Sequence, residues 1–507
     1  MASKRTLNRR EFLGVAGAAA AASTITVLPR RVLGGPGFVA PSDKINLALI
    51  GSGTMGINLL VGEWLTNENL HISCVCDPNT DSTDYRDWSA HGIRNRVRRF
   101  LDQPNWGEND QGIRAGREVG REIIEAHYAR ARGTNGYEGC ITYIDFRDLL
   151  EQETDLDGVL IMTPDHLHAT IAIAAMNKGL HAISHKTLSN VLYEVRLAAE
   201  TAEKTGVVSH LMAWNNDPDF YNLQDWIRGG VIGPIREVHN WTNRPVWPQG
   251  WLDPLPEQPV PGGLRWDLWL GPVPDMPYNL NYTHALFRGW YDFGAGCMGD
   301  MGNYSLSRVY RILDPGPPSV IEATAATGAM VIDGNVSRWR RSQVAFPDAA
   351  TIRFRHPARG TRPPLDIWWY SGGMKPPTCD ELYEDGQSYP PEGMLFVGEY
   401  GKILGDFHGR NFRLLPDKRM KAFEGMFETK EREVVGPPDE WINAIKEGKQ
   451  SRGSFQNFQD LAEATCLGNL AIRMGQRLEW DAETMTVTNL AAANQYLRRE
   501  YRPGWAL

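Results

Sequence analysis

The chain has 507 residues, of which 42% are hydrophobic and 22% are charged. These fractions are ordinary for a globular protein, and they exclude a wholly disordered chain, a coiled coil and a polytopic membrane protein. The 61 acidic residues outnumber the 53 lysines and arginines, so the net charge is −8 and nothing points to a nucleic-acid partner, which needs a basic face. The six cysteines are too few for a disulfide scaffold, and no Cys or His spacing predicts a metal site.

The first thirty residues have the order of an export signal. Asn8-Arg-Arg-Glu-Phe-Leu-Gly14 precedes an alanine-rich run that ends near Leu28. The run is too short and too weakly apolar to span a membrane, and the Arg-Arg-x-Phe-Leu pattern resembles the twin-arginine signal. We therefore expect residues 1–43 to be a signal and linker. The protein is then periplasmic or otherwise exported, and its mature chain has no integral membrane segment.

A dinucleotide-binding motif opens the mature chain. The apolar run Ile45–Ile50 predicts a strand, a helical pattern begins after residue 56, and G-x-G-x-x-G lies between them. The first glycine permits the tight turn, the second lets a pyrophosphate approach the backbone, and the third lets the helix pack on the strand. The residues predicted to hold the cofactor here are Gly51, Ser52, Gly53, Thr54, Met55 and Gly56.

The second strand predicts which dinucleotide binds. His71–Cys76 has strand character and ends at Asp77, where an acid hydrogen-bonds the adenosine ribose. Because a carboxylate at this position repels the additional phosphate of NADP, we predict NAD. Residues 81–137 then interrupt the pattern as a polar, arginine-rich insertion with one helix over 119–131. We interpret this insertion as a solvated surface elaboration.

Two more strand ends carry polar residues. Strands are expected over 158–162 and 181–184, with a helix over 169–178 between them. Ligands of an open parallel sheet bind at the carboxyl ends of its strands, so the residues that follow these strands are expected to face the nicotinamide. The predicted cofactor contacts are Thr163, Pro164, His168 and Lys186, and the predicted substrate contacts are His166 and His185.

This order of motifs resembles the Gfo/Idh/MocA oxidoreductase family. In that family, G-x-G-x-x-G, the ribose-binding acid and a Thr-Pro-x-x-x-His turn precede a Glu-Lys-Pro motif, which here stands as His185-Lys186-Thr187. The second half is similar to the exported branch of the family. The similar segments begin at Trp241 (Trp-Thr-Asn-Arg-Pro-Val-Trp-Pro-Gln-Gly), Arg288 (Arg-Gly-Trp-Tyr-Asp-Phe-Gly) and Gly299 (Gly-Asp-Met-Gly).

The resemblance implies an architecture and a reaction. An α/β Rossmann domain at residues 44–188 would carry NAD, and an α+β domain at 189–507 with a large, mostly antiparallel open sheet would supply the substrate face. The second domain would also form dimers or tetramers. Members oxidise or reduce a hydroxyl on a sugar, polyol or glycoside, and some relatives cleave glycosides by transient oxidation with tightly held NAD.

The resemblance also implies a catalytic set, which this chain keeps in part. Lys186 and Asp300 stand at the positions of the family's lysine and first aspartate, but Tyr304 stands where the family has a histidine. A tyrosine is a poor base unless a nearby cation lowers its pKa. Three alternatives stay open: Tyr304 acts with support from Lys186, His185 or His166 takes the proton, or the dehydrogenase activity is lost.

The remaining site residues come from the second half. Tryptophan faces suit the apolar faces of sugar rings, and Trp290, beside the Gly-Asp-Met-Gly turn, is the one expected in the substrate site. Asn215 follows an expected strand over 207–214, where relatives present polar groups to substrate. The open functions are an NAD-dependent oxidoreductase, an NAD-assisted glycoside-cleaving enzyme, and a non-catalytic sugar- and NAD-binding protein.

Overall fold

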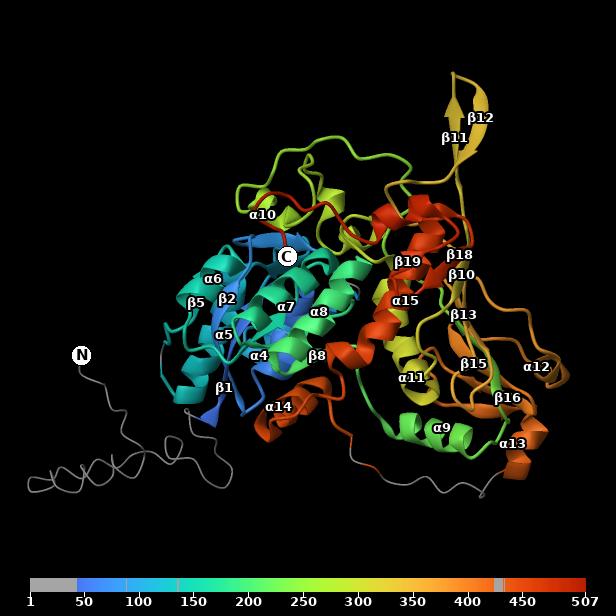
Figure 1. The fold of residues 1–507 in the computed structure, drawn as a ribbon. Coiled ribbons are helices and arrows are strands. Elements are labelled where there is room, and N and C mark those ends of the chain that lie inside the picture. The colour runs from blue at the N-terminus through green and yellow to red at the C-terminus, as the bar shows by residue number, and fades with distance from the viewer. Residues whose placement is uncertain (1–42, 88, 135, 424–431, 433) are drawn as a thin grey trace, which may run out of the picture. The chain divides into compact units, whose positions relative to one another are not determined.

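The computed structural model describes residues 43–507 except 88, 135, 424–431 and 433, and its helices and strands are drawn in Figure 1. The expected export signal lies outside the described residues. All elements described here belong to the unit Ile45–Leu507. Within the described part of the chain, no helix combines the length and the apolar character that crossing a bilayer requires.

The first sheet is the expected Rossmann sheet. It has six parallel strands in the order β5-β2-β1-β6-β7-β8. Helix α5 (Arg117–Arg132) contacts β2, while α7 (His168–Asn177) contacts β6 and β7 and packs against α8 (Leu192–Thr205). The strands are β1 (Ile45–Ile50), β2 (Leu70–Cys76), β5 (Ile141–Tyr143), β6 (Gly158–Ile161), β7 (His181–Ser184) and β8 (Ser209–Leu211).

Two features of this sheet differ from the sequence-based expectation. The strand expected over 207–214 is only three residues long in β8. Because β8 pairs with β7, the sheet extends to Leu211, beyond the boundary expected at residue 188. A parallel neighbour requires a crossover helix, and α8 is that helix, so the chain has to pass through α8 before it can complete the sheet.

The insertion after β2 is partly buried against the first sheet, although the sequence predicted a solvent-exposed segment. It contains the strand pair β3 (Ser82–Tyr85) and β4 (Ile113–Ala115) and helix α4 (Gly92–Leu101). Ile93 and Val97 of this helix are buried in the same apolar cluster as Leu49 of β1 and Ile72 of β2. The interpretation of the insertion as a solvated surface is therefore wrong for this part of it.

The second sheet confirms the expected large, mostly antiparallel sheet. Its order is β17-β16-β15-β9-β14-β13-β10-β18-β19, and among these neighbours only β9 and β14 run parallel. The strands are β9 (Ile235–Trp241), β10 (Val320–Ala325), β13 (Ala350–His356), β14 (Leu365–Tyr370), β15 (Gly393–Gly398), β16 (Gly401–Gly405), β17 (Arg413–Leu415), β18 (Leu478–Asp481) and β19 (Thr486–Val487).

Helices α11 (Asn303–Leu313) and α15 (Phe455–Met474) lie between the two sheets (Figure 1). Helix α15 contacts α8 of the Rossmann half and also β10 and β13 of the second sheet. One apolar cluster consequently runs from Val159 in β6 to Trp369 in β14. This packing brings the start of α11 to the carboxyl end of β7, where Lys186 lies.

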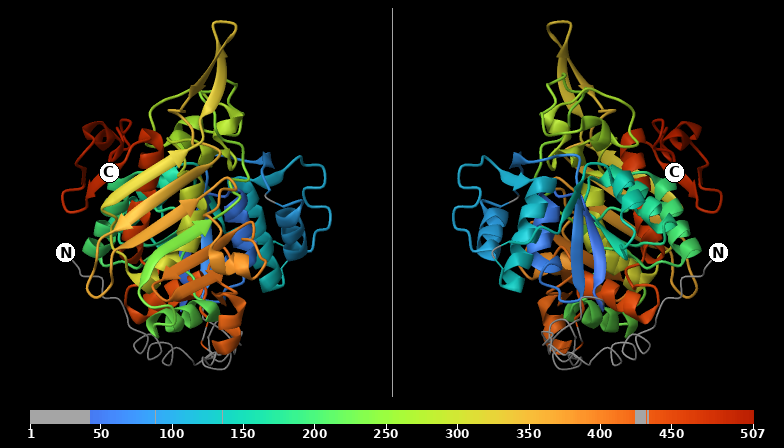
Figure 2. Two further views of the ribbon diagram at one scale, coloured as in Figure 1. Left: turned by 90° about the vertical axis from the view of Figure 1, so that its right-hand side faces the viewer. Right: turned by 90° about the vertical axis from the view of Figure 1, so that its left-hand side faces the viewer.

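A hairpin leaves this packed body. Strands β11 (Gly328–Ile332) and β12 (Val336–Arg340) pair only with each other and project beyond the second sheet (Figure 2). The side chain of Trp339 on this hairpin is largely exposed.

Candidate functional site

The glycine-rich turn after β1 has the geometry that its sequence predicts. Gly51 has a φ of +97°, and a Cβ there would lie 2.6 Å from the carbonyl carbon of Met162. A Cβ on Gly56 would overlap the carbonyl oxygen of Gly51. The first glycine therefore permits the turn and the third permits contact between helix α3 (Thr54–Leu59) and β1, as expected.

A pocket follows the carboxyl edge of the first sheet from Asp77, after β2, to His185, after β7. The second domain closes it with Phe287 and Arg288, among other residues. The sequence-predicted residues that line it are Gly51, Gly53, Thr54, Met55, Asp77, Thr163, Pro164 and His185. The predicted cofactor residues that do not line it are Ser52, Gly56, His168 and Lys186.

Asp77 is fixed at one end of this pocket. Its carboxylate accepts hydrogen bonds from the backbone N–H of Ser52 at 2.7 Å and of Asn79 at 2.8 Å. Burial raises the pKa of Asp77, while the two N–H donors oppose that shift. The acid thus lies against the glycine-rich turn, where the ribose of a dinucleotide binds.

The insertion reaches the same end of the pocket. The ring of Tyr85 lies over Gly53, because a Cβ on that glycine would be 3.1 Å from Cε1 of the tyrosine. The ring centroid of Tyr85 is 3.9 Å from that of His284, which comes from the second domain. Neither residue was predicted, because an irregular insertion contains no motif that indicates which side chain turns inward.

A buried charge cluster lies at the opposite end. The Lys186 ammonium pairs with the Asp300 carboxylate, and Nε of Arg288 donates to the same carboxylate at 2.9 Å. Burial favours the neutral acid, but the charges of Lys186 and Arg288 hold the pKa of Asp300 well below its usual range. Burial lowers the pKa of Lys186, and Arg288 adds to this shift. The predicted pair Lys186 and Asp300 is therefore joined by a third charged residue, which the prediction missed.

His185 and Tyr304 are hydrogen-bonded beside this cluster. The Tyr304 hydroxyl lies 3.0 Å from Nε2 of His185. Burial lowers the pKa of His185 far below its usual value, and the charge of Lys186 adds to this shift. Burial raises the pKa of Tyr304, and the charge of Asp300 adds to that. The tyrosine is therefore the donor and the neutral imidazole the acceptor, which does not support a Tyr304 made acidic by Lys186.

His166 and Trp290 are buried away from the pocket. His166 has its two ring nitrogens 2.9 and 3.3 Å from backbone carbonyl oxygens, and burial lowers its pKa to about 3. Trp290 stacks on Trp251 at 4.6 Å and donates its Nε1 hydrogen to the carbonyl of Asn281 at 2.9 Å. The structure therefore places neither residue where a substrate could touch it, in contrast to the prediction.

His168 joins two strand-end segments instead of facing a cofactor. Its ring nitrogens lie 2.5 Å from the carbonyl oxygen of Thr187 and 2.8 Å from that of Thr163. The residue is completely buried. These two contacts fix the position of the Thr163 turn relative to the segment that carries Lys186.

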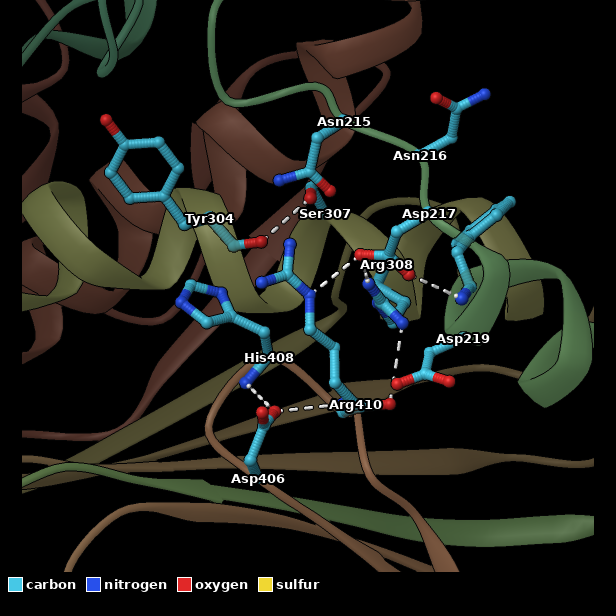
Figure 3. A network of polar contacts seen from close by, with 12 residues as sticks. Asn215, Asn216, Asp217, Asp219, Tyr304, Ser307, Arg308, Asp406, His408 and Arg410 are labelled. Atoms are coloured by element: carbon cyan, nitrogen blue, oxygen red, sulfur yellow. Dashed lines mark hydrogen bonds and ion pairs between the residues drawn. The ribbon is translucent and has the colours of Figure 1, made fainter. Parts of the chain in front are cut away.

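Asn215 lies next to a network of charged residues (Figure 3). Its carboxamide has no hydrogen-bond partner among the described residues, whereas the neighbouring Asn216 turns away and donates to the Tyr221 hydroxyl at 2.7 Å. The network contains Arg308 on α11 and Arg410 after β16, which share the carboxylate of Asp217 at 2.8 and 2.7 Å. None of these three charged residues was predicted.

Buried neutral histidines should make the stability of the protein depend on pH. Burial holds the pKa of His166, His210 and His356 at about 3, against about 6.5 in an unfolded chain. The contribution of these histidines to the free energy of unfolding is then fully present above pH ~6.5. It is lost as the pH falls toward 3, by at most ~1.4 kcal/mol per pH unit for each histidine. Asp77 and Asp165, whose pKa is raised by burial, act in the opposite direction.

Denaturant unfolding of the wild type and of His356→Gln, compared between about pH 7 and about pH 5, measures this effect. The wild type should lose stability faster than the variant as the pH falls. Equal slopes would contradict the prediction for His356.

The fold and the site define a protein with a dinucleotide-binding Rossmann domain. A glycine-rich turn and a fixed acid lie at one end of the pocket, and a buried lysine–aspartate pair lies at the other. Residues 113–212 match the model described as oxidoreductase family, NAD-binding Rossmann fold, and residues 224–361 match the model described as oxidoreductase family, C-terminal alpha/beta domain. The chain belongs to this Gfo/Idh/MocA family, and its Rossmann domain is NAD-binding.

Individual relatives are similar to parts of the chain. Levoglucosan dehydrogenase of Pseudarthrobacter phenanthrenivorans is 31% identical over 143 residues, which are 26% of this chain and 36% of that protein. A glycosyl hydrolase family 109 protein of Shewanella putrefaciens is 24% identical over 243 residues, which are 45% of this chain and 44% of that protein. The chain thus spans less than half the length of these relatives.

One solved structure supports the fold. The WlbA dehydrogenase of Chromobacterium violaceum, solved with NADH and UDP-GlcNAcA, has a TM-score of 0.51 and 15% sequence identity. The similarity covers 87% of this chain and 97% of that one, so it extends over both sheets.

Proposed function

We propose that the protein is an NAD-dependent oxidoreductase that acts on a hydroxyl of a sugar, polyol or glycoside. The observation that carries the proposal is the cluster of Lys186, Asp300 and Arg288, which meets the cofactor pocket at the end opposite to Asp77. A substrate hydroxyl at this end would lie next to both the nicotinamide and a fixed set of charges. The similarity to levoglucosan dehydrogenase supports a sugar as the substrate.

The residues present suit proton transfer coupled to a hydride step. Bound NAD supplies the hydride acceptor or donor. In the oxidation direction, the substrate hydroxyl gives its proton to the Tyr304 oxygen while the Tyr304 hydroxyl gives its own proton to Nε2 of His185. Tyr304 then never has to ionise, which agrees with its raised pKa, whereas the lowered pKa of His185 makes its imidazolium a short-lived proton carrier. Lys186 lies behind the pocket wall, where it holds Asp300 ionised and keeps positive charge next to the reacting hydroxyl.

The cofactor content of the purified protein tests the proposal first. Protein purified without added NAD is denatured, and the released NAD(H) is measured per chain. The folded protein, with NAD added if necessary, is then incubated with sugars deuterated at their carbinol carbons, and transfer of deuterium to the nicotinamide is followed. We expect NAD to bind and deuterium to move from at least one sugar. A protein that fails to bind added NAD would contradict the proposal.

A second candidate is glycoside cleavage with NAD used catalytically. It is favoured by the similarity to glycosyl hydrolase family 109 proteins over 45% of the chain. Nitrophenyl glycosides, with NADH followed in parallel, separate the two functions. Release of nitrophenol without net NADH supports cleavage, whereas NADH without nitrophenol supports the oxidoreductase. Sugar binding with neither product, and with no deuterium transfer, supports a non-catalytic binding protein.

A further inference from the structure

Arg410 presents two unpaired guanidinium nitrogens beside the candidate substrate site. Its Nε donates to the Asp217 carboxylate at 2.7 Å, and its backbone N–H donates to Asp406 at 2.9 Å. Its two terminal nitrogens have no partner among the described residues, and the side chain is 41% exposed. Figure 3 shows these nitrogens pointing toward Asn215, on the side of Asp217 that faces Tyr304.

The orientation of this guanidinium is fixed by its neighbours. Asp217 caps helix α9 (Pro218–Arg228) by accepting from the backbone N–H of Phe220 at 2.8 Å, so its carboxylate cannot rotate freely. The same carboxylate accepts from Arg308 at 2.8 Å. The single negative charge of Asp217 is therefore shared by two guanidinium groups, and positive charge is left at the free end of Arg410.

The other acids of the network do not compensate this charge from the same side. Asp406 accepts from the backbone N–H of His408 and of Arg410, each at 2.9 Å, and Asp219 accepts from that of Asn411 at 2.9 Å. In Figure 3 both carboxylates lie on the side of Arg410 away from Asn215. The terminal nitrogens of Arg410 thus face the Asn215 carboxamide and the neutral ring of His408 instead of an acid.

This charged group lies close to the proposed reaction centre. Arg308, which shares Asp217 with Arg410, follows Tyr304 by four residues on α11, so the two residues lie about one turn, or about 6 Å, apart along the helix axis. Tyr304 in turn contacts His185 at the cofactor pocket. In Figure 3 the unpaired carboxamide of Asn215 lies to the right of Tyr304 and above the terminal nitrogens of Arg410.

The geometry points to an acidic sugar as the substrate. Its carboxylate or phosphate group would bind the terminal nitrogens of Arg410, while one of its hydroxyls lies at the Tyr304–His185 pair. A guanidinium whose Nε is already bound offers its two end nitrogens in a fork that matches two oxygens of an oxyanion, whereas a neutral sugar offers no such partner. This inference rests on the proposed function and specifies the substrate class of the same site.

Binding measurements on the NAD-loaded protein test the inference. Glucuronate, galacturonate, gluconate and glucose 6-phosphate are compared by calorimetry with glucose and galactose. We expect at least one acidic sugar to bind about tenfold to a hundredfold more tightly than its neutral parent, because the charged hydrogen bonds are made only with the acid. Arg410→Gln should remove this preference without changing the affinity for the neutral sugar or the NAD content. The carboxylated and phosphorylated probes show which oxyanion the site prefers.

Arg236→Gln is the matched control, because Arg236 is an exposed arginine of β9 that pairs with Glu399. It should bind every probe as the wild type does. The inference is overturned if no acidic sugar binds more tightly than its neutral parent, or if Arg410→Gln weakens acidic and neutral sugars equally. Deuterium transfer from neutral sugars alone would overturn this inference and leave the proposed function intact. A preference for acidic sugars that depends on Arg410, without deuterium transfer, would support the acidic ligand and overturn the proposed function.

Discussion

Replacing Lys186 with methionine is expected to abolish hydride transfer, by a factor of about a thousand or more, while NAD stays bound. Lys186 does not line the cofactor pocket, so the cofactor loses no contact. The reaction site, in contrast, loses one of the two cations that flank Asp300. Methionine has a similar length, and Arg288 still neutralises Asp300, so the buried carboxylate keeps one cation. Deuterium transfer and NAD content, measured on the same sample, check both halves of the prediction.

Removal of one partner from a buried ion pair typically costs 3–5 kcal/mol, roughly, so thermal unfolding has to accompany the assay. Lys402→Met is the control, because Lys402 pairs with Glu381 near the surface. Tyr304→Phe should fall between wild type and Lys186→Met, because it breaks the proton path and leaves the charge cluster intact. A Lys186→Met protein that transfers hydride at the wild-type rate would exclude the proposed role of the lysine.

Replacing Gly51 with alanine is expected to abolish NAD binding and to destabilise the protein by several kcal/mol, roughly. The added Cβ would lie 2.6 Å from the carbonyl carbon of Met162 and 2.7 Å from the backbone nitrogen of Thr163. Both are backbone atoms of the neighbouring strand end, which cannot give way without moving the turn. Titration with NADH and denaturant unfolding measure the two effects.

Gly179→Ala separates the cost of the left-handed backbone from the cost of the contact between the added Cβ and the Met162 strand end. Gly179 has a φ of +83°, close to that of Gly51, but a Cβ there meets no atom within 4 Å. Gly179→Ala should lower the free energy of unfolding by only about 1 kcal/mol, because of the left-handed backbone alone, and leave NAD binding unchanged. If both variants behaved alike, the contact with the Met162 strand end would not be the reason for the glycine.

The Rossmann half could be predicted because its signals are local. An apolar run, a glycine turn and an acid at the end of the next strand depend on neighbours in the sequence, and β1, β2, β6 and β7 lie where the pattern placed them. The pair Lys186 and Asp300 came from resemblance to a family and not from any pattern in the residues. The length of strand β8 was overestimated, because apolar residues that flank it, such as Val207 and Trp214, are buried in the core without continuing the sheet.

The parts of the site that were missed depend on which way a side chain turns. His166 and His185 both follow a strand end, but only His185 lines the pocket, and no periodicity distinguishes them. Trp290 and Arg288 stand two positions apart in one motif, and the structure turns the arginine toward the charge cluster and the tryptophan into the core. The insertion that carries Tyr85 has no regular repeat from which its inward face could be read.

The apolar cluster that runs through both sheets has a consequence for how the protein holds together. Because Val159 and Trp369 belong to one continuous core, unfolding of either half would expose apolar surface of the other, and we expect the chain to unfold in a single transition. A ligand that binds only the folded form adds to the stability of everything that unfolds with its site. Occupancy of the dinucleotide pocket should therefore protect β13 and β14, far from any atom of the cofactor, against proteases. In this molecule, resistance of the distant sheet to digestion would report whether the cofactor is present.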